Sequence, residues 1–553
     1  MEETFALSAL TLALAAWLAP RAHRRLQLSR AKHRSLAGHS RMAKRVAGLI
    51  PGYAYDEAAF FASDGASAEV IARRKAGFAR LSEQLNTRHA KSIEKSAQLR
   101  ELLPDLQFTG SYRVPFQYSP FLREHLKLGS FLQGSEGVKV EDLDGERLFD
   151  LTGSYGVNVF GYDFYKACIA EANAMVGELG PVLGAYHPCV LDNAERLKKI
   201  SGLDAVSFHM SGTEAVMQAV RLARYHTGRS HLVRFCGAYH GWWEDVQPGP
   251  GNPVTPRQTY TLKDMEERSL QVLRTRRDIA CVLINPLQAL HPNASAPGDS
   301  TLVDSSRRAG FDRAAYTDWL KRLRAVCSER GIVLIFDEVF VGFRLAPGGA
   351  QEYFGIKADL VTYGKTLGGG LPVGVVCGKK ELMVRTKPGR PADICFARGT
   401  FNAHPYVMAA MNVFLRRIEE PARAKRYAGL DERWIENLAR FNARLEAANL
   451  PVRVAGLSTI WTVLYNKPSR YNWMLQFYLR EQGLGLSWVG SGRMIWSLNY
   501  ESAEVDEVAT RFVAAAQAMQ RDGWWHEGGA QLSNKEIRRS LLIEMLRRKF
   551  GLD

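Results

Sequence analysis

Paired cysteines are absent from this 553-residue sequence. Its seven cysteines stand singly between Cys168 and Cys395, and no CxxC pair occurs. An odd number of scattered cysteines argues against a disulfide framework and a cysteine zinc site, and favours a reducing compartment. With 46% hydrophobic and 24% charged residues, the composition also excludes a disordered, collagen-like or polytopic membrane protein. The length predicts two or three globular domains.

Acidic residues are missing from one stretch near the N-terminus. None occurs between Arg21 and Asp56, whereas nine lysines and arginines lie from Arg21 to Arg45. More than half of the formal net charge of +16 therefore sits in this block. No zinc-finger spacing or aromatic RNA-binding motif accompanies it, so we expect no nucleic-acid partner.

An uncharged, mostly apolar run of 17 residues, Thr4–Pro20, precedes the basic block. This length is short for a membrane-spanning helix, and a cleaved signal peptide carries its positive charge before the apolar run rather than after it. The charge order predicts that residues 1–50 contact a membrane, either as an anchor or as a surface helix, with the main body on the cytoplasmic face. The alternative is an N-terminal helix that packs against the protein.

Strand-like and helical segments alternate from about residue 137 onward. We expect strands at Val206–Met210, His231–Cys236, Ile279–Asn285, Ile332–Phe336, Leu360–Tyr363 and Val373–Cys377. Gly137–Leu151 is expected to form two further strands around the Asp144-Gly145 turn. This alternation predicts an α/β domain with a mainly parallel sheet.

The remaining segments divide the chain further. A helical lead-in covers Ala66–Leu103, a smaller α+β unit ends in a helix at Val505–Met519, and the tail contains a basic helix at Asn534–Phe550. The expected units are residues 1–50, a membrane-anchor and basic segment; 51–135, the helical lead-in and the N-terminal part of the small domain; 136–424, the large ligand-binding domain; 425–522, the small C-terminal domain; and 523–553, the helical tail.

Three motifs at the ends of predicted strands carry chemistry. Lys365 follows a strand and precedes three glycines in VTYGKTLGGGLP, where a lysine of lowered pKa could form a Schiff base. Asp337 ends a buried strand, where α/β sheets bind ligands, and could hold a pyridine nitrogen protonated. The turn Met210–Ala215 (MSGTEA) opens a helix whose N-terminus could bind phosphate. Taken singly, each residue could instead be a surface lysine, a turn aspartate or a helix cap.

A fourth motif, Gly237–Gly241 (GAYHG), places an aromatic ring after the next strand, where it could stack on a flat cofactor. The ordered series SGTEA, GAYHG, FDEV, GKTLGGGLPVG and GTFNAHP resembles the class III aminotransferases of fold type I, and most closely their glutamate-1-semialdehyde aminomutase branch. The resemblance covers residues 126–520. It implies the fold of pyridoxal 5′-phosphate (PLP) enzymes: a large domain with a mainly parallel sheet and a smaller α+β domain, here with an N-terminal helical extension.

The resemblance also implies roles around the cofactor ring. Lys365 matches the lysine that forms the Schiff base and moves the proton. Asp337 matches the partner of the pyridine nitrogen, while Val339 and Tyr239 match the residues behind and in front of the ring. His240 and Glu338 match residues near the ring with supporting roles.

Other matched residues lie around the phosphate and the phenolic oxygen. Ser211, Gly212 and Thr213 match the phosphate cup, and Gln288 matches the glutamine near the phenolic oxygen. Thr400 matches a threonine that reaches the phosphate of the neighbouring subunit, which implies a homodimer.

The sequence departs from the family pattern after Asn285. It reads NPLQAL, so that Leu290 replaces a glutamate that pairs with a gating arginine in several family members. This departure argues against a basic ω-amino acid as substrate. Together with Trp242 and Trp243, which could equally be packing residues, it favours an apolar or lipid-linked carbonyl.

The function expected from these features is PLP-dependent transfer of an amino group from a small-molecule donor to a carbonyl acceptor. The alternative is an aminomutase that exchanges the two groups within one substrate. A catalytically dead scaffold would lack Lys365 or Asp337, and a DNA-binding PLP regulator would need a winged helix-turn-helix pattern within residues 1–125.

Overall fold

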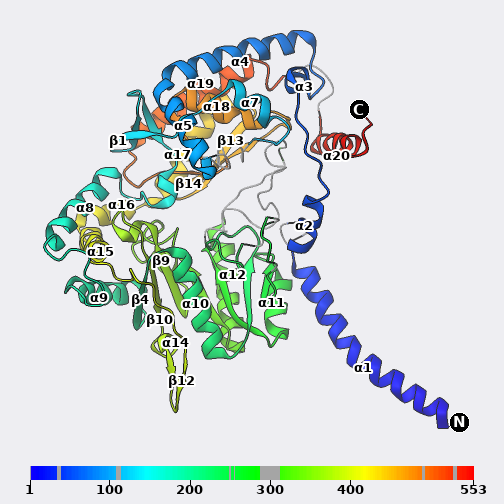
Figure 1. The fold of residues 1–553 in the computed structure, drawn as a ribbon, viewed down its shortest axis with the longest axis vertical. Coiled ribbons are helices and arrows are strands. Elements are labelled where there is room, and N and C mark those ends of the chain that lie inside the picture. The colour runs from blue at the N-terminus through cyan, green and yellow to red at the C-terminus, as the bar shows by residue number, and fades with distance from the viewer. Residues whose placement is uncertain are drawn as a thin grey trace.

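The structure is a computed structural model. It describes residues 2–552 except 34–35, 37–38, 107–113, 248, 250, 255, 287–304, 306–311, 488–491 and 527–531. The helices of the large domain surround one central sheet, and a second group of helices and strands lies above this domain (Figure 1).

The central sheet has seven strands in the order β4-β10-β9-β8-β7-β5-β6. All neighbouring strands are parallel except β10, which runs antiparallel to both β4 and β9. The strands are β4 (Ala205–His209), β5 (His231–Phe235), β6 (Thr259–Leu262), β7 (Ile279–Ile284), β8 (Val333–Asp337), β9 (Leu360–Gly364) and β10 (Gly374–Gly378). The expected mainly parallel sheet is confirmed, and β6 is an additional strand.

Continuous apolar runs explain why this sheet is buried on both faces. Every residue of β7, β8, β9 and β10 is buried, as is typical of parallel sheets covered by helices. The helices of this domain are α8 (Tyr162–Val176), α9 (Cys189–Ser201), α10 (Gly212–Thr227), α11 (Glu267–Thr275), α12 (Arg313–Arg330), α13 (Gly349–Phe354), α14 (Lys380–Met383) and α15 (Pro405–Ile418).

Sheet topology brings distant motifs together. Strands β5, β8 and β9 run in the same direction, so their carboxyl ends lie at one edge of the sheet. Asp337 is the last residue of β8, Lys365 directly follows β9, and Tyr239 follows β5 by four residues. Ligands bind at this edge in open α/β sheets.

Two smaller sheets complete the upper part. One has the order β1-β2-β3-β15 and joins β1 (Leu132–Glu136), β2 (Lys139–Asp142) and β3 (Arg147–Asp150) to the distant β15 (Leu484–Gly485). The other joins β13 (Val452–Leu457), β14 (Ile460–Tyr465) and β16 (Met494–Ile495). The two expected strands around the Asp144-Gly145 turn are β2 and β3.

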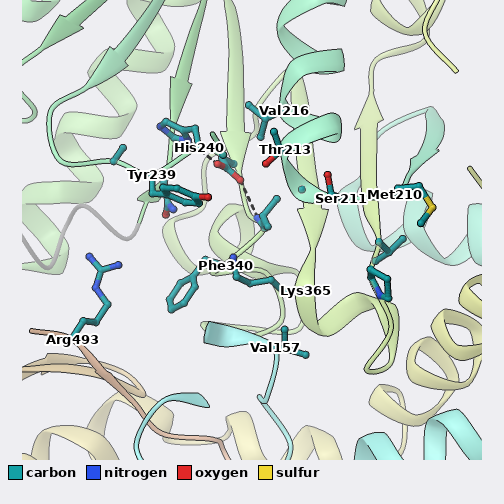
Figure 2. A pocket seen from close by; sticks show the side chains of 18 of the residues that line it. Val157, Met210, Ser211, Thr213, Val216, Tyr239, His240, Phe340, Lys365 and Arg493 are labelled. Atoms are coloured by element: carbon teal, nitrogen blue, oxygen red, sulfur yellow. Dashed lines mark hydrogen bonds and ion pairs between the residues drawn. The ribbon is translucent and has the colours of Figure 1, made fainter. Parts of the chain in front are cut away.

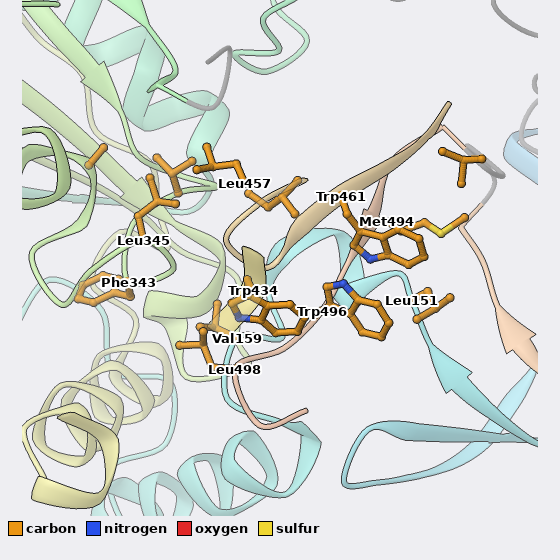
Figure 3. Close-up of a cluster of buried hydrophobic side chains, with 14 of the residues drawn as sticks. Leu151, Val159, Phe343, Leu345, Trp434, Leu457, Trp461, Met494, Trp496 and Leu498 are labelled. Carbon is orange, nitrogen blue, oxygen red and sulfur yellow. The ribbon is translucent and has the colours of Figure 1, made fainter. Parts of the chain in front are cut away.

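Helices cover these sheets and the large domain. These helices are α16 (Pro421–Tyr427), α17 (Leu430–Ala447), α18 (Leu475–Glu481) and α19 (Ser502–Arg521). A small hairpin, formed by β11 (Thr386–Lys387) and β12 (Arg390–Ile394), projects from the large domain. Three tryptophans stack in the core between them (Figure 3): the rings of Trp461 and Trp496 are 4.9 Å apart, and those of Trp434 and Trp496 are 5.6 Å apart. Large aromatic surfaces buried in this way stabilise the packing.

Arg344 links the two halves of the protein, the large domain and the group of elements above it, through hydrogen bonds. Its buried guanidinium donates to Thr459 Oγ1 and the Trp496 carbonyl at 2.9 Å, and to the carbonyls of Gly156 and Asn158 at 3.3 and 3.4 Å. Burial lowers the pKa of Arg344 to about 10. Hydrogen bonds from a charged donor are among the stronger ones in proteins, so this side chain fixes β16 relative to the segment after β8.

The N-terminal helix α1 (Glu2–Ala31) contains the apolar run, with Pro20 inside it. Its C-terminal part packs against α11, and its N-terminal part projects away from the body (Figure 1). Leu10, Leu12, Leu14 and Trp17 are more than half exposed, so the alternative of a fully packed N-terminal helix is wrong for these residues. In the part of the chain that the structure describes, no helix has the length and apolarity that crossing a membrane requires.

The lead-in and the tail are helical, as expected. The elements are α2 (Ser40–Ala47), α3 (Glu57–Ala62), α4 (Ala68–Arg88), α5 (Ala90–Leu102), α7 (Ser119–His125) and α20 (Asn534–Phe550). The stretch Ala66–Leu103 is broken at His89, whose ring Nδ1 is 2.6 Å from Asp142. The helix predicted at Asn534–Phe550 has these bounds.

Candidate active site

A cavity of about 460 Å³ lies at the carboxyl edge of the central sheet. It contains Lys365, Asp337, His240, Tyr239, Val339 and the turn Ser211–Thr213 (Figure 2). Eight of the residues with expected cofactor roles therefore line one cavity, although they come from four separate motifs. Further lining residues are Val157, Met210, Val216, Asn285, Phe340, Leu371, Pro372 and Arg493.

Asp337 and His240 form a buried pair. His240 Nδ1 is 2.7 Å from Asp337 Oδ2. The amide of Val339 and the hydroxyl of Thr362 each donate a hydrogen bond to Asp337 Oδ1 at a distance of 3.2 Å. Burial lowers the pKa of His240, against the opposing effect of Asp337. The ring is therefore neutral near pH 7 and donates from Nδ1. Because a carboxylate has about four acceptor positions, one on Asp337 is left for a protonated ring nitrogen.

Lys365 stands at the end of β9 in an unusual backbone conformation. Its φ is +48°, in the left-handed region, which costs a non-glycine residue about 1–2 kcal/mol. Burial lowers its pKa, and the charges of Arg344 and Arg493 add to this effect, whereas Asp337 opposes it. Its Nζ lies 5.7 Å from the ring centre of Phe340. A buried amine with a lowered pKa has the reactivity that a nucleophilic lysine needs.

The first turn of α10 forms another wall of the cavity. Ser211 is its N-cap and accepts a hydrogen bond from the Glu214 amide, so the helix begins at the cavity with its amides toward it. A Cβ at Gly212 would lie 2.6 Å from Val339 Cγ1, and therefore only glycine lets this turn approach the end of β8. Helix N-termini of this kind bind phosphate groups.

Tyr239 lies at the mouth of the cavity with 59% of its surface exposed, and Val339 lies inside it. Figure 2 shows Tyr239 beside His240, and Lys365 beside Phe340. Trp242 is 75% exposed, whereas Trp243 packs against a hydrophobic cluster of the large domain. The packing interpretation therefore fits Trp243, and Trp242 is open for contact with a ligand or a partner.

Two residues with expected roles, Thr400 and Glu338, lie outside this cavity. Thr400 is exposed and does not line this cavity. Glu338 points away from it and accepts hydrogen bonds from the amides of Ala350 and Gln351, so its expected place near the ring is wrong. This buried position raises the pKa of Glu338 to about 8. Gln288 and Leu290 lie outside the described residues.

Arg493 is the main lining residue that sequence reasoning missed. It immediately precedes β16, which pairs with β14 in the smaller C-terminal sheet, yet it reaches the cavity. Figure 2 places Arg493 at the opposite end from Ser211 and Thr213. No local motif marks this residue, because its approach to Lys365 depends on how the two halves of the protein pack. Phe340 and Val157 were missed for the same reason.

These residues fit PLP. The α10 N-terminus suits the phosphate, the Asp337–His240 pair suits the ring nitrogen, and Lys365 suits the carbonyl carbon. His240 Nε2 is buried and has no hydrogen-bond partner among the described residues, which marks a polar position that a bound group could satisfy.

Comparison with known proteins agrees with this fit. The family model described as aminotransferase class-III matches residues 122–516. A glutamate-1-semialdehyde 2,1-aminomutase of Geotalea daltonii is 32% identical over 363 residues, which cover 62% of this chain and 78% of the relative. The enzyme of the same name from Nitratidesulfovibrio vulgaris is 35% identical over 347 residues, covering 61% and 77%. A solved structure described as a transaminase with PLP bound is 27% identical with a TM-score of 0.62, covering 78% of this chain and 99% of its own.

Proposed function

Because the chain belongs to the class III aminotransferase family, we propose that it transfers an amino group from a carboxylate-bearing donor to an apolar carbonyl acceptor. The enzyme is PLP-dependent. The observation that carries the proposal is the cavity in which Lys365, the Asp337–His240 pair and the α10 N-terminus meet. When bound, PLP supplies an electrophilic carbonyl and a ring that withdraws electrons.

The cavity residues bind and orient the cofactor. The amides of the turn 211–213 and the hydroxyls of Ser211 and Thr213 would hold the phosphate, with the helix dipole favouring its negative charge. Asp337 would accept a hydrogen bond from the protonated ring nitrogen, and His240 fixes the orientation of the Asp337 carboxylate through the 2.7 Å contact. Val339 and Tyr239, which both line the cavity, would pack against the ring.

Lys365 binds the cofactor and moves the proton. Its lowered pKa gives it a larger neutral fraction near pH 7 than a surface lysine has. The neutral amine would accept the proton that the substrate carbon releases and hold it at Nζ until it returns the proton to the substrate or the cofactor. The Phe340 ring, whose centre lies 5.7 Å from Nζ, borders the space in which the amine would act.

The proposed substrates follow from the remaining lining residues. Arg493 carries positive charge at the end of the cavity away from Ser211 and Thr213, which suits the carboxylate of an amino donor. Val157, Met210, Phe340 and Leu371 give the rest of the lining an apolar character, which suits an apolar carbonyl compound.

An aminomutase is the second candidate, since relatives of 31–35% identity are named glutamate-1-semialdehyde 2,1-aminomutase. Omitting the amino donor separates the two reactions. With a carbonyl acceptor alone we expect no product. When an amino acid donor is added, we expect each acceptor molecule that is consumed to give one molecule of aminated product. Product formed from a single aminocarbonyl substrate without a donor would show the aminomutase reaction instead.

We also propose a homodimer in which Thr400 completes the cavity of the neighbouring subunit. This is supported by the exposure of Thr400 away from its own cavity. It is also supported by exposed aromatic residues before and after it, Phe396 at 70% and Phe401 at 50%, and by Tyr239 at the cavity mouth. Exposed aromatic surface of this kind is enriched at protein interfaces.

Mixing two inactive variants tests the dimer. If Thr400 acts across the interface, random pairing of Lys365→Ala with Thr400→Ala chains gives half heterodimers, each with one intact site. We therefore expect about a quarter of the wild-type activity. Lys365→Ala mixed with Asp337→Asn is the control, because both residues serve the same subunit's site and no activity should return. A fully active monomer in sedimentation would contradict the proposal.

We further propose that the protein associates with the cytoplasmic face of a membrane through residues 1–50. This is supported by the exposed apolar residues of α1 and by the nine basic residues that follow the apolar run. Apolar side chains enter the headgroup region of a bilayer, and basic side chains attract anionic lipids.

A further inference from the structure

The C-terminal helix α20 presents an apolar and basic outer face. Leu542, Ile543, Leu546 and Phe550 are 39–66% exposed, and Leu552 just beyond the helix is 69% exposed. The six basic residues of the helix are all exposed: Lys535, Arg538, Arg539, Arg547, Arg548 and Lys549. Both kinds of side chain can contact a bilayer surface, since cations attract anionic headgroups and apolar side chains enter the headgroup region.

The two acidic residues of α20 do not offset this charge on the outer face. Glu536 is engaged at the N-terminus, where it forms a capping box with Ser533. Glu544 points inward, and its carboxylate accepts hydrogen bonds from Arg470 at 2.6 Å, from Tyr53 at 3.2 Å and from Tyr55. The face that remains exposed is therefore strongly basic.

These contacts fix α20 against the N-terminal segment. Ile537 is fully buried, and Glu544 links the helix to both Tyr53 and Tyr55. Arg548 lies 6.0 Å from the Tyr53 ring. The exposed leucines thus belong to a held helix rather than to a frayed end.

The segment that precedes Tyr53 has the same character. Met42, Leu49 and Ile50 are 45–61% exposed, and Arg41 and Arg45 of α2 are exposed beside them in sequence. Figure 1 shows α1, α2 and α20 along the same side of the molecule. Both ends of the chain therefore supply basic and apolar side chains to one side.

We propose that α20 and the α1–α2 segment form one surface that docks onto an anionic lipid bilayer; this rests on the proposed membrane association. Charge complementarity selects this partner. A second copy of the chain would present the same positive charge and be repelled, and nucleic acid would leave the exposed leucines and Phe550 without apolar contact. A bilayer with anionic headgroups satisfies both kinds of side chain.

Co-sedimentation of the full-length, PLP-loaded protein with vesicles tests this surface. We expect binding to mixed phosphatidylcholine–phosphatidylglycerol vesicles and little to pure phosphatidylcholine. The triple variant Arg539→Gln, Arg547→Gln, Lys549→Gln should bind about 100-fold more weakly, since each cation near an anionic surface contributes about fivefold. The control Lys198→Gln, Lys199→Gln, Arg390→Gln removes three exposed charges elsewhere and should bind like the wild type. A second variant, Leu542→Ser, Leu546→Ser, Phe550→Ser, should also bind weakly while keeping the cofactor absorption of the wild type.

The outcomes separate the parts of the account. If both α20 variants bind like the wild type while Leu10→Ser, Leu14→Ser, Trp17→Ser loses binding, the role of α20 is overturned and the N-terminal association stands. If the wild type binds no vesicles, both membrane proposals fail, and the donor-dependent reaction is unaffected. Pelleting without vesicles, or displacement from vesicles by duplex DNA, would show a different partner and would also overturn the inference.

Discussion

We expect that replacing Lys365 by alanine will lower the rate of amino transfer by about 10⁴-fold, because the variant loses both the nucleophile and the group that moves the proton. The cavity keeps its α10 N-terminus and its Asp337–His240 pair. The variant should therefore still bind PLP non-covalently. Steady-state rates with a fixed donor and acceptor, together with the absorption of bound cofactor after gel filtration, measure both effects.

The matched control for this variant is Lys380→Ala. Lys380 is an exposed lysine of α14 in the same domain and does not line the cavity. It should retain full activity. Full activity of Lys365→Ala itself would show that another residue carries the chemistry.

We expect that replacing Asp337 by asparagine will lower the rate by about 10³-fold, similar to the loss of one preorganised electrostatic interaction in an active site. Asparagine keeps the size of the side chain but loses the negative charge that holds a proton on the ring nitrogen. It also leaves His240 opposite an amide rather than a carboxylate. Rates, and the absorption spectrum of the bound cofactor as a function of pH, report the loss separately from any failure to bind.

The control for the charge change is Asp318→Asn. The side chain of this aspartate is 69% exposed on α12, and it pairs with Arg322, one helical turn further along α12, at 3.2 Å. Its replacement should leave activity and spectrum unchanged. An Asp337→Asn variant with wild-type rate and spectrum would remove Asp337 from the proposed mechanism.

The sequence predicts the central sheet well because the strands are long continuous apolar runs. Strands β7, β8 and β9 are buried along their whole length, and their parallel order follows from the helices between them. Once the strands are placed, the positions of Asp337 and Lys365 follow, because each lies at the carboxyl end of its strand.

What the sequence does not reveal depends on packing between distant segments. Strand β15 has two residues and pairs with β3, which lies more than 300 residues earlier in the sequence. No local sequence pattern therefore predicts it. Arg493 lines the same cavity as Lys365 because Arg344 and the neighbouring elements bring the two halves together. The inward turn of Glu338 is likewise decided by the amides of α13. The exposure of α1 and α20 also required the structure, since an apolar run by itself is equally compatible with burial.

Mapping the attachment site of the cofactor tests the central claim most directly. The PLP-loaded wild type is reduced with borohydride, digested with protease and analysed by mass spectrometry. The account predicts that the cofactor mass stays on the peptide containing Lys365 and on no other peptide, and that a cofactor-loaded Lys365→Ala protein retains none after the same treatment. Cofactor attached to a different lysine, or recovered entirely free from the reduced wild type, would contradict it.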